Sequence, residues 1–263
     1  GGALGLVRTR EMEEAERALD ADIAWLGHGP DDPVHDFGFS KSGPDTLGRW
    51  GEDRIVERLV RAYRRFRPDI VIPTFLDVPG QHGHHRAMTQ AAEMAIALAT
   101  DPLYSTGDLP PWQVAKFYLP AWSGGGDTYD DEIPPPPATT SVRAVGTDPA
   151  TGLPHDQLGE VSRAFHASQN MGHWRYPPRA EWPLHLVNGQ AEPGITHGLP
   201  SRLADLGPTP QLAEADAAIE RALAQFADRN ALLQALCAGQ QALEAAVKEL
   251  SAAEMARHGH RLA

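Results

Sequence analysis

The chain has 263 residues, of which 41% are hydrophobic and 22% are charged. This length and composition allow a globular domain with a full core, and no apolar run approaches the roughly 20 residues that a membrane-spanning helix needs. The formal net charge of −12 would repel nucleic-acid phosphates and anionic lipids. The composition therefore excludes a membrane-embedded protein and argues against nucleic acid as a partner.

Two further features bear on partners and compartment. Arginines cluster over residues 58–67, but the same predicted helix carries Glu52, Asp53 and Glu57, so we interpret it as a solvated helix face. Cys237 is the only cysteine, which rules out an intrachain disulfide and a cysteine-rich zinc site. These features leave open whether the soluble protein acts in the cytoplasm or is secreted, and they do not define its oligomeric state.

Hydrophobic patterns predict alternating helices and strands over the first two thirds of the chain. Helices are predicted over residues 8–19, 49–67, 85–100 and 157–169, and strands over residues 23–26, 70–74, 114–119, 141–145 and 184–187. The order helix, strand, loop, helix over residues 49–100 is typical of a parallel α/β unit. We therefore predict an α/β fold with a Rossmann-like, mostly parallel sheet flanked by helices.

The composition changes toward the C-terminus. From Leu212 onward the chain is rich in Ala, Leu, Glu and Gln, with apolar residues at helical spacing. We predict one domain over residues 1–188, then a linker and a helical hairpin appendage over residues 189–263. Residues 27–48 are predicted to form a long loop, and loops of this length in compact domains are often functional.

Three histidines follow the strand predicted over residues 70–74. His82, His84 and His85 lie where a Pro-Gly turn gives way to an alanine-rich helix. Loops after the carboxyl ends of strands line the ligand crevice of open α/β sheets, so His82 and His85 can point at one ligand or metal ion. Histidines that are merely polar loop residues are the simpler alternative, but three imidazoles in four residues favour a functional role.

Four segments in order along the chain resemble motifs of the PIG-L/LmbE-like family of zinc-dependent de-N-acetylases, which act on N-acetylglucosaminyl compounds. Residues 8–11 resemble the family's Arg-x-x-Glu helix, and residues 36–38 resemble its Asp-containing loop. Residues 82–87, His-Gly-His-His-Arg-Ala, resemble its His-Pro-Asp-His-Arg-Ala segment. Residues 166–169 resemble its late His-x-Ser-Gln.

The resemblance implies an activity and a role for several residues. The activity would be removal of the N-acetyl group from an N-acetylglucosamine-type amino sugar, with Zn²⁺ as the cofactor. His85 corresponds to a zinc ligand, and His82 to the imidazole that stabilises or protonates the tetrahedral intermediate. Arg8 and Asp36 correspond to positions that contact the substrate. His84, one residue before His85, is expected to point elsewhere.

Two other residues keep two interpretations each. His166 either donates to a residue of the site or is an ordinary polar helix residue. Asp77 either orients His82 or His85, or only caps the turn before them.

The sequence departs from the family pattern in two places. Residues 83 and 84 are Gly and His where the family has Pro and Asp. The family's first strand, which should precede Arg8 and end in His-Pro-Asp-Asp-Glu, is absent, so we expect that the chain starts in mid-domain. Residues 28–32 contain similar residue types, but they follow the first helix, and we interpret them as a Pro-Asp turn in a loop. A chain without the first motif is expected to bind metal weakly, if at all.

Two further hypotheses remain open. One is a metal-free carbohydrate-binding or structural remnant of the same fold, without catalytic activity. The other is a different metal hydrolase with its own ligand set, in which Asp31 or Asp32 would lie within reach of His85.

Overall fold

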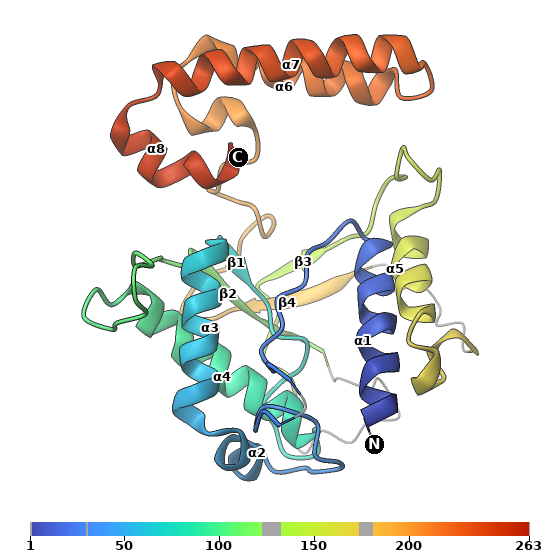
Figure 1. Ribbon diagram of the computed structural model, residues 1–263, viewed down its shortest axis with the longest axis vertical. Helices are drawn as coiled ribbons and strands as arrows, with labels where there is room; N and C mark the ends of the chain where they lie inside the picture. Colours follow the sequence, from blue (N-terminus) through green and yellow to red (C-terminus); the bar gives the residue numbers. More distant parts are fainter. Residues whose placement is uncertain (1, 30, 123–132, 174–180, 263) are drawn as a thin grey trace. The chain divides into compact units, whose positions relative to one another are not determined.

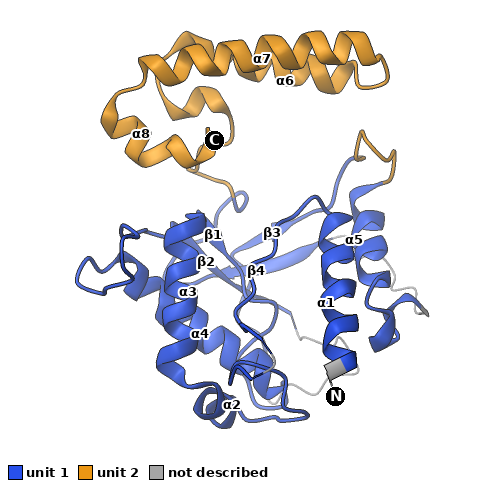
Figure 2. Cartoon of the chain, viewed as in Figure 1, with its two compact units in different colours: residues 1–146, 154–195 blue, residues 147–153, 196–263 orange. Residues whose placement is uncertain are grey.

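The computed structural model describes residues 2–29, 31–122, 133–173 and 181–262 (Figure 1). The chain divides into two compact units: unit 1 comprises residues 1–146 and 154–195, and unit 2 comprises residues 147–153 and 196–263 (Figure 2). The boundary predicted from the sequence, between residues 188 and 189, stays a prediction. Within unit 1, Glu192 accepts hydrogen bonds from Lys116 and from the Tyr118 hydroxyl, both in the sheet.

Unit 1 contains a four-stranded sheet in the order β1-β2-β4-β3. β1 (Ile70–Val71) pairs in parallel with β2 (Lys116–Pro120), whereas β4 (Trp182–Leu186) pairs antiparallel with both β2 and β3 (Thr140–Val142). The prediction of a mostly parallel sheet is therefore wrong for the described strands, which are mostly antiparallel. The connections decide strand direction: a helix crosses over between β1 and β2, as a parallel pair requires, but β4 returns beside β2 from the opposite end.

The described part of unit 1 contains helices α1 (Gly2–Arg17), α2 (Gly43–Trp50), α3 (Glu52–Phe66), α4 (Gly83–Thr100) and α5 (His155–Ala164). The single helix predicted over residues 49–67 is split at Gly51, where φ is 79°. The predicted strand over residues 23–26 is irregular. β1 is shorter than predicted and ends before Pro73, which has no amide hydrogen for a sheet ladder. α1 packs beside α5 (Figure 1).

Helices α3 and α4 form the main core of unit 1. Ile55, Leu59 and Val60 of α3 are buried together with the small side chains of Ala87 and Ala91 of α4. Alanine at the contact allows the two helices to approach closely. The spacing of Ile55, Leu59, Tyr63 and Phe66 predicts one apolar face for this helix; the first three are buried, whereas Phe66 is 53% exposed.

Arg64 joins α3 to the carboxyl end of α4. Its side chain is only 2% exposed. It donates to Thr106 Oγ1 and to the carbonyl oxygens of Leu98, Ala99, Asp101 and Tyr104. The last carbonyls of a helix have no partners within the helix, and they carry partial negative charge. A buried guanidinium satisfies several of them at once, so α4 is anchored at the end opposite to its histidines.

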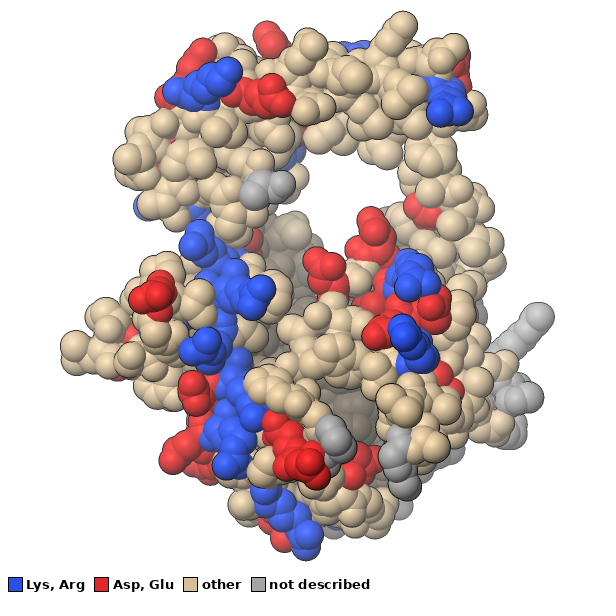
Figure 3. Space-filling model, in the orientation of Figure 1, with Lys and Arg blue, Asp and Glu red and all other residues tan. Residues whose placement is uncertain are grey.

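The remaining arginines of α3 form a basic stripe on the surface, with acidic side chains beside it (Figure 3). Arg58 Nη2 lies 2.8 Å from Asp32 Oδ2, and Arg61 donates to the Thr106 carbonyl at 3.1 Å. Part of this stripe is therefore occupied by contacts within the chain.

Unit 2 is built on the helical hairpin that the sequence predicts. α6 (Pro210–Ala224) packs along α7 (Arg229–Glu249), and α8 (Ala252–His258) follows. Leu206, Leu212, Ala246 and Leu250 form its core. Among the helices of the described residues, none has the length and apolar character needed to cross a membrane.

Candidate functional site

The histidines lie beyond the carboxyl end of β1, at the start of α4. His82 is the N-cap residue of α4, and His84 and His85 lie in its first turn. The rings of His82 and His85 stack with centroids 5.2 Å apart and an angle of 23° between their planes. His85 also stacks on Phe75, at 3.9 Å and 8°. The structure therefore brings together the two imidazoles that the sequence assigned to one site.

His84 points in another direction, as expected for a residue adjacent to His85. Its ring centroid lies 4.7 Å from that of Phe37 and 5.4 Å from that of Trp50. Its Nε2 atom is 3.7 Å from Asp36 Oδ1. Burial lowers the pKa of His84, and the nearby Asp36 only partly opposes this shift.

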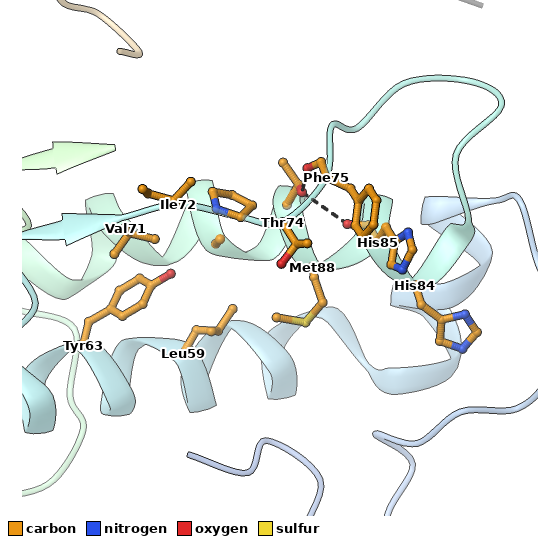
Figure 4. A pocket seen from close by; sticks show the side chains of 12 residues that line it. Leu59, Tyr63, Val71, Ile72, Thr74, Phe75, His84, His85 and Met88 are labelled. Carbon is orange, nitrogen blue, oxygen red and sulfur yellow. Dashed lines mark hydrogen bonds between the residues drawn. The ribbon is translucent and has the colours of Figure 1, made fainter. Parts of the chain in front are cut away.

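A cavity of about 410 Å³ lies beside β1, between residues 71–75 and helices α3 and α4 (Figure 4). Leu59 and Tyr63 of α3 and Met88 of α4 line its apolar part, and His84 and His85 also belong to its lining. Burial raises the pKa of the Tyr63 hydroxyl well above its usual range. The histidine cluster thus borders a largely apolar cavity with few polar groups, which is the usual composition of a small-molecule site.

Arg8 and Asp36, the predicted substrate contacts, pair with each other across two elements. Arg8 Nη1 of α1 lies 3.4 Å from Asp36 Oδ2 in the loop before α2, and both side chains are substantially exposed. Asp36 also accepts a hydrogen bond from the backbone N–H of Gly38 at 2.8 Å. Asp36 lies close to His84 as well, so the Arg8–Asp36 pair reaches the first turn of α4.

The loop reaches α4 through a close backbone contact at Gly83. The N–H of Gly83 donates to the carbonyl of Ser40 at 2.7 Å. A Cβ atom at position 83 would lie 2.6 Å from the Ser42 carbonyl oxygen and 2.8 Å from Thr46 Oγ1. This contact explains the departure from the family motif, because proline at this position would lack the N–H and would add ring atoms where no space exists.

Gln81 is a neighbour of the site that the sequence did not reveal. Its side chain is fully buried, and its Oε1 atom lies 3.4 Å from His85 Nδ1. An amide is buried at low cost only when it is hydrogen-bonded, so this side chain restricts the orientation of the His85 ring. The spacing of four residues at a helix start was the one signal that could have identified it.

The hydrogen-bond partners of Asp77 among the described residues belong to α4 and are other than His82 and His85. Its carboxylate accepts from Arg86 Nε at 2.8 Å and from Gln90 Nε2 at 2.6 Å. Asp77 therefore joins the loop after β1 to Arg86 and Gln90 of α4.

His166 is placed near α1. The N–H and hydroxyl of Ser168, two residues later, donate to the Glu11 carboxylate at 2.6 and 2.7 Å. These hydrogen bonds lower the pKa of Glu11, with a smaller effect from His166. The segment 166–169 thus fixes Glu11, which follows Arg8 by one helical turn.

The described residues do not form a complete zinc site. Within them, no group of three or more His, Cys, Asp or Glu side chains could hold a metal ion. A zinc site needs at least three protein ligands, and His82 and His85 offer two imidazoles. The donor set in the described ranges therefore does not fit zinc by itself.

Asp32 does not supply a missing ligand. It pairs with Arg58 and accepts from the backbone N–H groups of Val34, at 2.8 Å, and His28, at 3.0 Å. The hydrogen bond from Arg58 and then that from Val34 hold the pKa of Asp32 well below its usual range. The carboxylate thus organises a loop, in agreement with the interpretation of residues 28–32, and it gives no support to a metal hydrolase built on Asp32.

Residues 2–96 match the family model described as PIG-L, GlcNAc-PI de-N-acetylase. The resemblance to this family is thereby confirmed over these residues, which include Arg8, Asp36, His82 and His85. The match supports a hydrolase of the de-N-acetylase type. Residues 166–169 lie outside the matched range, and their assignment stays a prediction. Comparison with curated proteins gave no match.

The close contact at Gly83 predicts an effect on stability. Gly83→Ala should lower the free energy of unfolding by about 1–3 kcal/mol, because the methyl group must displace the Ser42 carbonyl or the start of α4. Urea denaturation followed by circular dichroism measures this change. Gly48→Ala is the matched control, since a Cβ there meets no atom within 4 Å and the position is helical. Equal stability of the two variants would show that the loop does not press on α4.

The environment of His85 predicts a pH dependence. Burial, with smaller effects from His82 and His84, lowers the pKa of His85 to about 4. In the unfolded chain this pKa is about 6.5, so the unfolded state binds a proton between about pH 6.5 and 4 that the folded state does not. Stability should therefore fall as pH falls through this window, and less so in His85→Gln. An NMR titration showing His85 protonating near pH 6.5 would contradict the burial argument.

Proposed function

We propose that the protein is a hydrolase that removes the acetyl group from the nitrogen of an N-acetylglucosamine-type amino sugar. The observation that carries this proposal is the arrangement within residues 2–96: the stacked pair His82 and His85 lies at the start of α4, and the Arg8–Asp36 pair reaches the same turn at His84. Imidazoles serve acid–base chemistry, and an exposed Arg–Asp pair suits the recognition of hydroxyl groups.

Each of these residues has a distinct proposed task. In the proposed reaction water adds to the amide carbonyl, the C–N bond breaks, and acetate and the free amine are the products. The half-buried imidazole of His82 supports the oxyanion and, as imidazolium, donates a proton to the departing amine; the proton that water loses restores it. Asp36 accepts hydrogen bonds from sugar hydroxyls, and Arg8 donates to them. His85 is stacked between two rings, which fixes its direction.

Zn²⁺ is the proposed cofactor, with His85 as one ligand. The described residues bring together no complete ligand set, so further ligands are required for a zinc site. This same observation favours a second candidate function: a carbohydrate-binding protein of this fold that keeps Arg8 and Asp36 but does not hydrolyse the amide.

Acetate release distinguishes the two candidates. In the presence of zinc, the hydrolase should release acetate from N-acetylglucosamine compounds, and His82→Gln should lower kcat by about 10²- to 10⁴-fold with a small change in KM. His155→Gln, an exposed histidine at the start of α5, is the matched control and should keep full activity. Metal content of each preparation is measured alongside. Sugar binding without acetate release from the zinc-loaded protein would support the second candidate.

A further inference from the structure

Phe39 is an unusually exposed aromatic residue beside the candidate site. Its side chain is 78% exposed, whereas none of the other exposed Phe and Trp residues in the described ranges exceeds the 53% of Phe66. Burying a phenylalanine stabilises a protein by about 1.5–3 kcal/mol, and Phe39 forgoes most of that stabilisation. Packing within the chain therefore does not explain why an aromatic side chain stands at this position, and exposed apolar side chains often mark binding sites.

The backbone around Phe39 is fixed on both sides. Before it, Gly38 has φ of 106° and donates its N–H to Asp36. After it, the Ser40 carbonyl accepts the hydrogen bond from Gly83. The ring is therefore displayed by a loop that is fastened to the first turn of α4.

The ring of Phe39 is aimed at the predicted catalytic histidine. Its centroid lies 5.4 Å from that of His82, with an angle of 78° between the planes, so one ring meets the other by its edge. Phe37, two residues earlier, differs in that it packs against His84 and under the guanidinium of Arg49. Of these two phenylalanines, Phe37 packs the loop against α2 and α4, and Phe39 presents its ring to solvent.

The groups around Phe39 define the chemistry of a matching ligand. Three residues before Phe39 the same loop carries the exposed carboxylate of Asp36, which pairs with the guanidinium of Arg8. A pyranose has the complementary form, because its axial C–H groups make an apolar face while its hydroxyls lie around the edge. A small number of polar groups then set the orientation of a ligand that is held mainly by apolar contact.

We propose that Phe39 is the platform on which the pyranose ring of the substrate stacks, and that it selects amino sugars over acyclic acetamides. This inference rests on the proposed function for the identity of the substrate. Stacking on Phe39 places one edge of the sugar beside His82 and leaves its hydroxyls within the surface formed by Arg8 and Asp36. Phe39 thus acts on binding rather than on the chemical step.

The test is a ligand-observed NMR titration of the full chain with two probes, N-acetylglucosamine and the acyclic N-acetylethanolamine. Phe39→Ala should weaken the binding of N-acetylglucosamine about 5- to 10-fold and leave that of N-acetylethanolamine unchanged, since only the sugar has a face to stack. Phe39→Trp should bind the sugar within about twofold of the original chain. Phe66→Ala is the matched control for loss of an exposed phenylalanine and should change neither Kd.

The spectra add a second readout. In the original chain the axial ring protons of the sugar should shift upfield on binding, because they lie over an aromatic face, and this shift should vanish in Phe39→Ala. Thermal unfolding confirms that each variant is folded. The inference is overturned if Phe39→Ala binds the sugar as the original chain does, if both probes lose affinity equally, or if the original chain does not bind the sugar. Stacking of the sugar without any acetate release would instead count against the proposed function alone.

Discussion

The hydrogen bond from Gly83 N–H to the Ser40 carbonyl fastens the loop before α2 to the first turn of α4, and the candidate site depends on it. Position 83 has no room for a side chain, so the two backbone segments touch directly. On one side of this contact the loop presents Asp36 and Phe39. On the other side α4 presents His82 and His85. Without the contact these groups would belong to two separate surfaces.

The rest of unit 1 holds this contact in place. The core between α3 and α4 fixes the axis of α4, and Arg64 anchors its carboxyl end. The histidines lie at the opposite end, at the start of the helix. Burial lowers the pKa of His84 and of His85, so the fold favours their neutral forms, which can accept a hydrogen bond or bind a metal ion.

Local sequence patterns predicted a large part of this arrangement. The stripe of α3, the alanine-rich α4 and the position of the histidines after β1 follow from spacing of three and four residues and from turn residues. The direction of β4 could not be predicted, because it depends on the connections and not on the residues of the strand. The exposed Phe39 also could not be predicted, since its surroundings depend on His82, which is far away in the sequence. Gln81 had one local signal, its spacing of four residues from His85.

The zinc ligands are a second case in which the sequence predicted only part of the site. Family motifs predicted roles for His82 and His85, and the structure places their rings together. The described residues nevertheless bring no third ligand to them, and the acidic residues considered as their partners bind other side chains. Asp77 binds Arg86 and Gln90, and Asp32 binds Arg58. The hydrogen-bond partners of an acidic side chain in the structure therefore indicate better than its position in the sequence whether it can bind a metal ion.

Amide hydrogen exchange measured with and without N-acetylglucosamine tests most directly whether the loop and the first turn of α4 form one sugar site. If they do, saturating sugar should slow exchange in residues 36–42 and in residues 82–86 together, and should leave α6 and α7 unchanged. Protection of only one of the two segments, or of neither at saturation, would contradict a shared site.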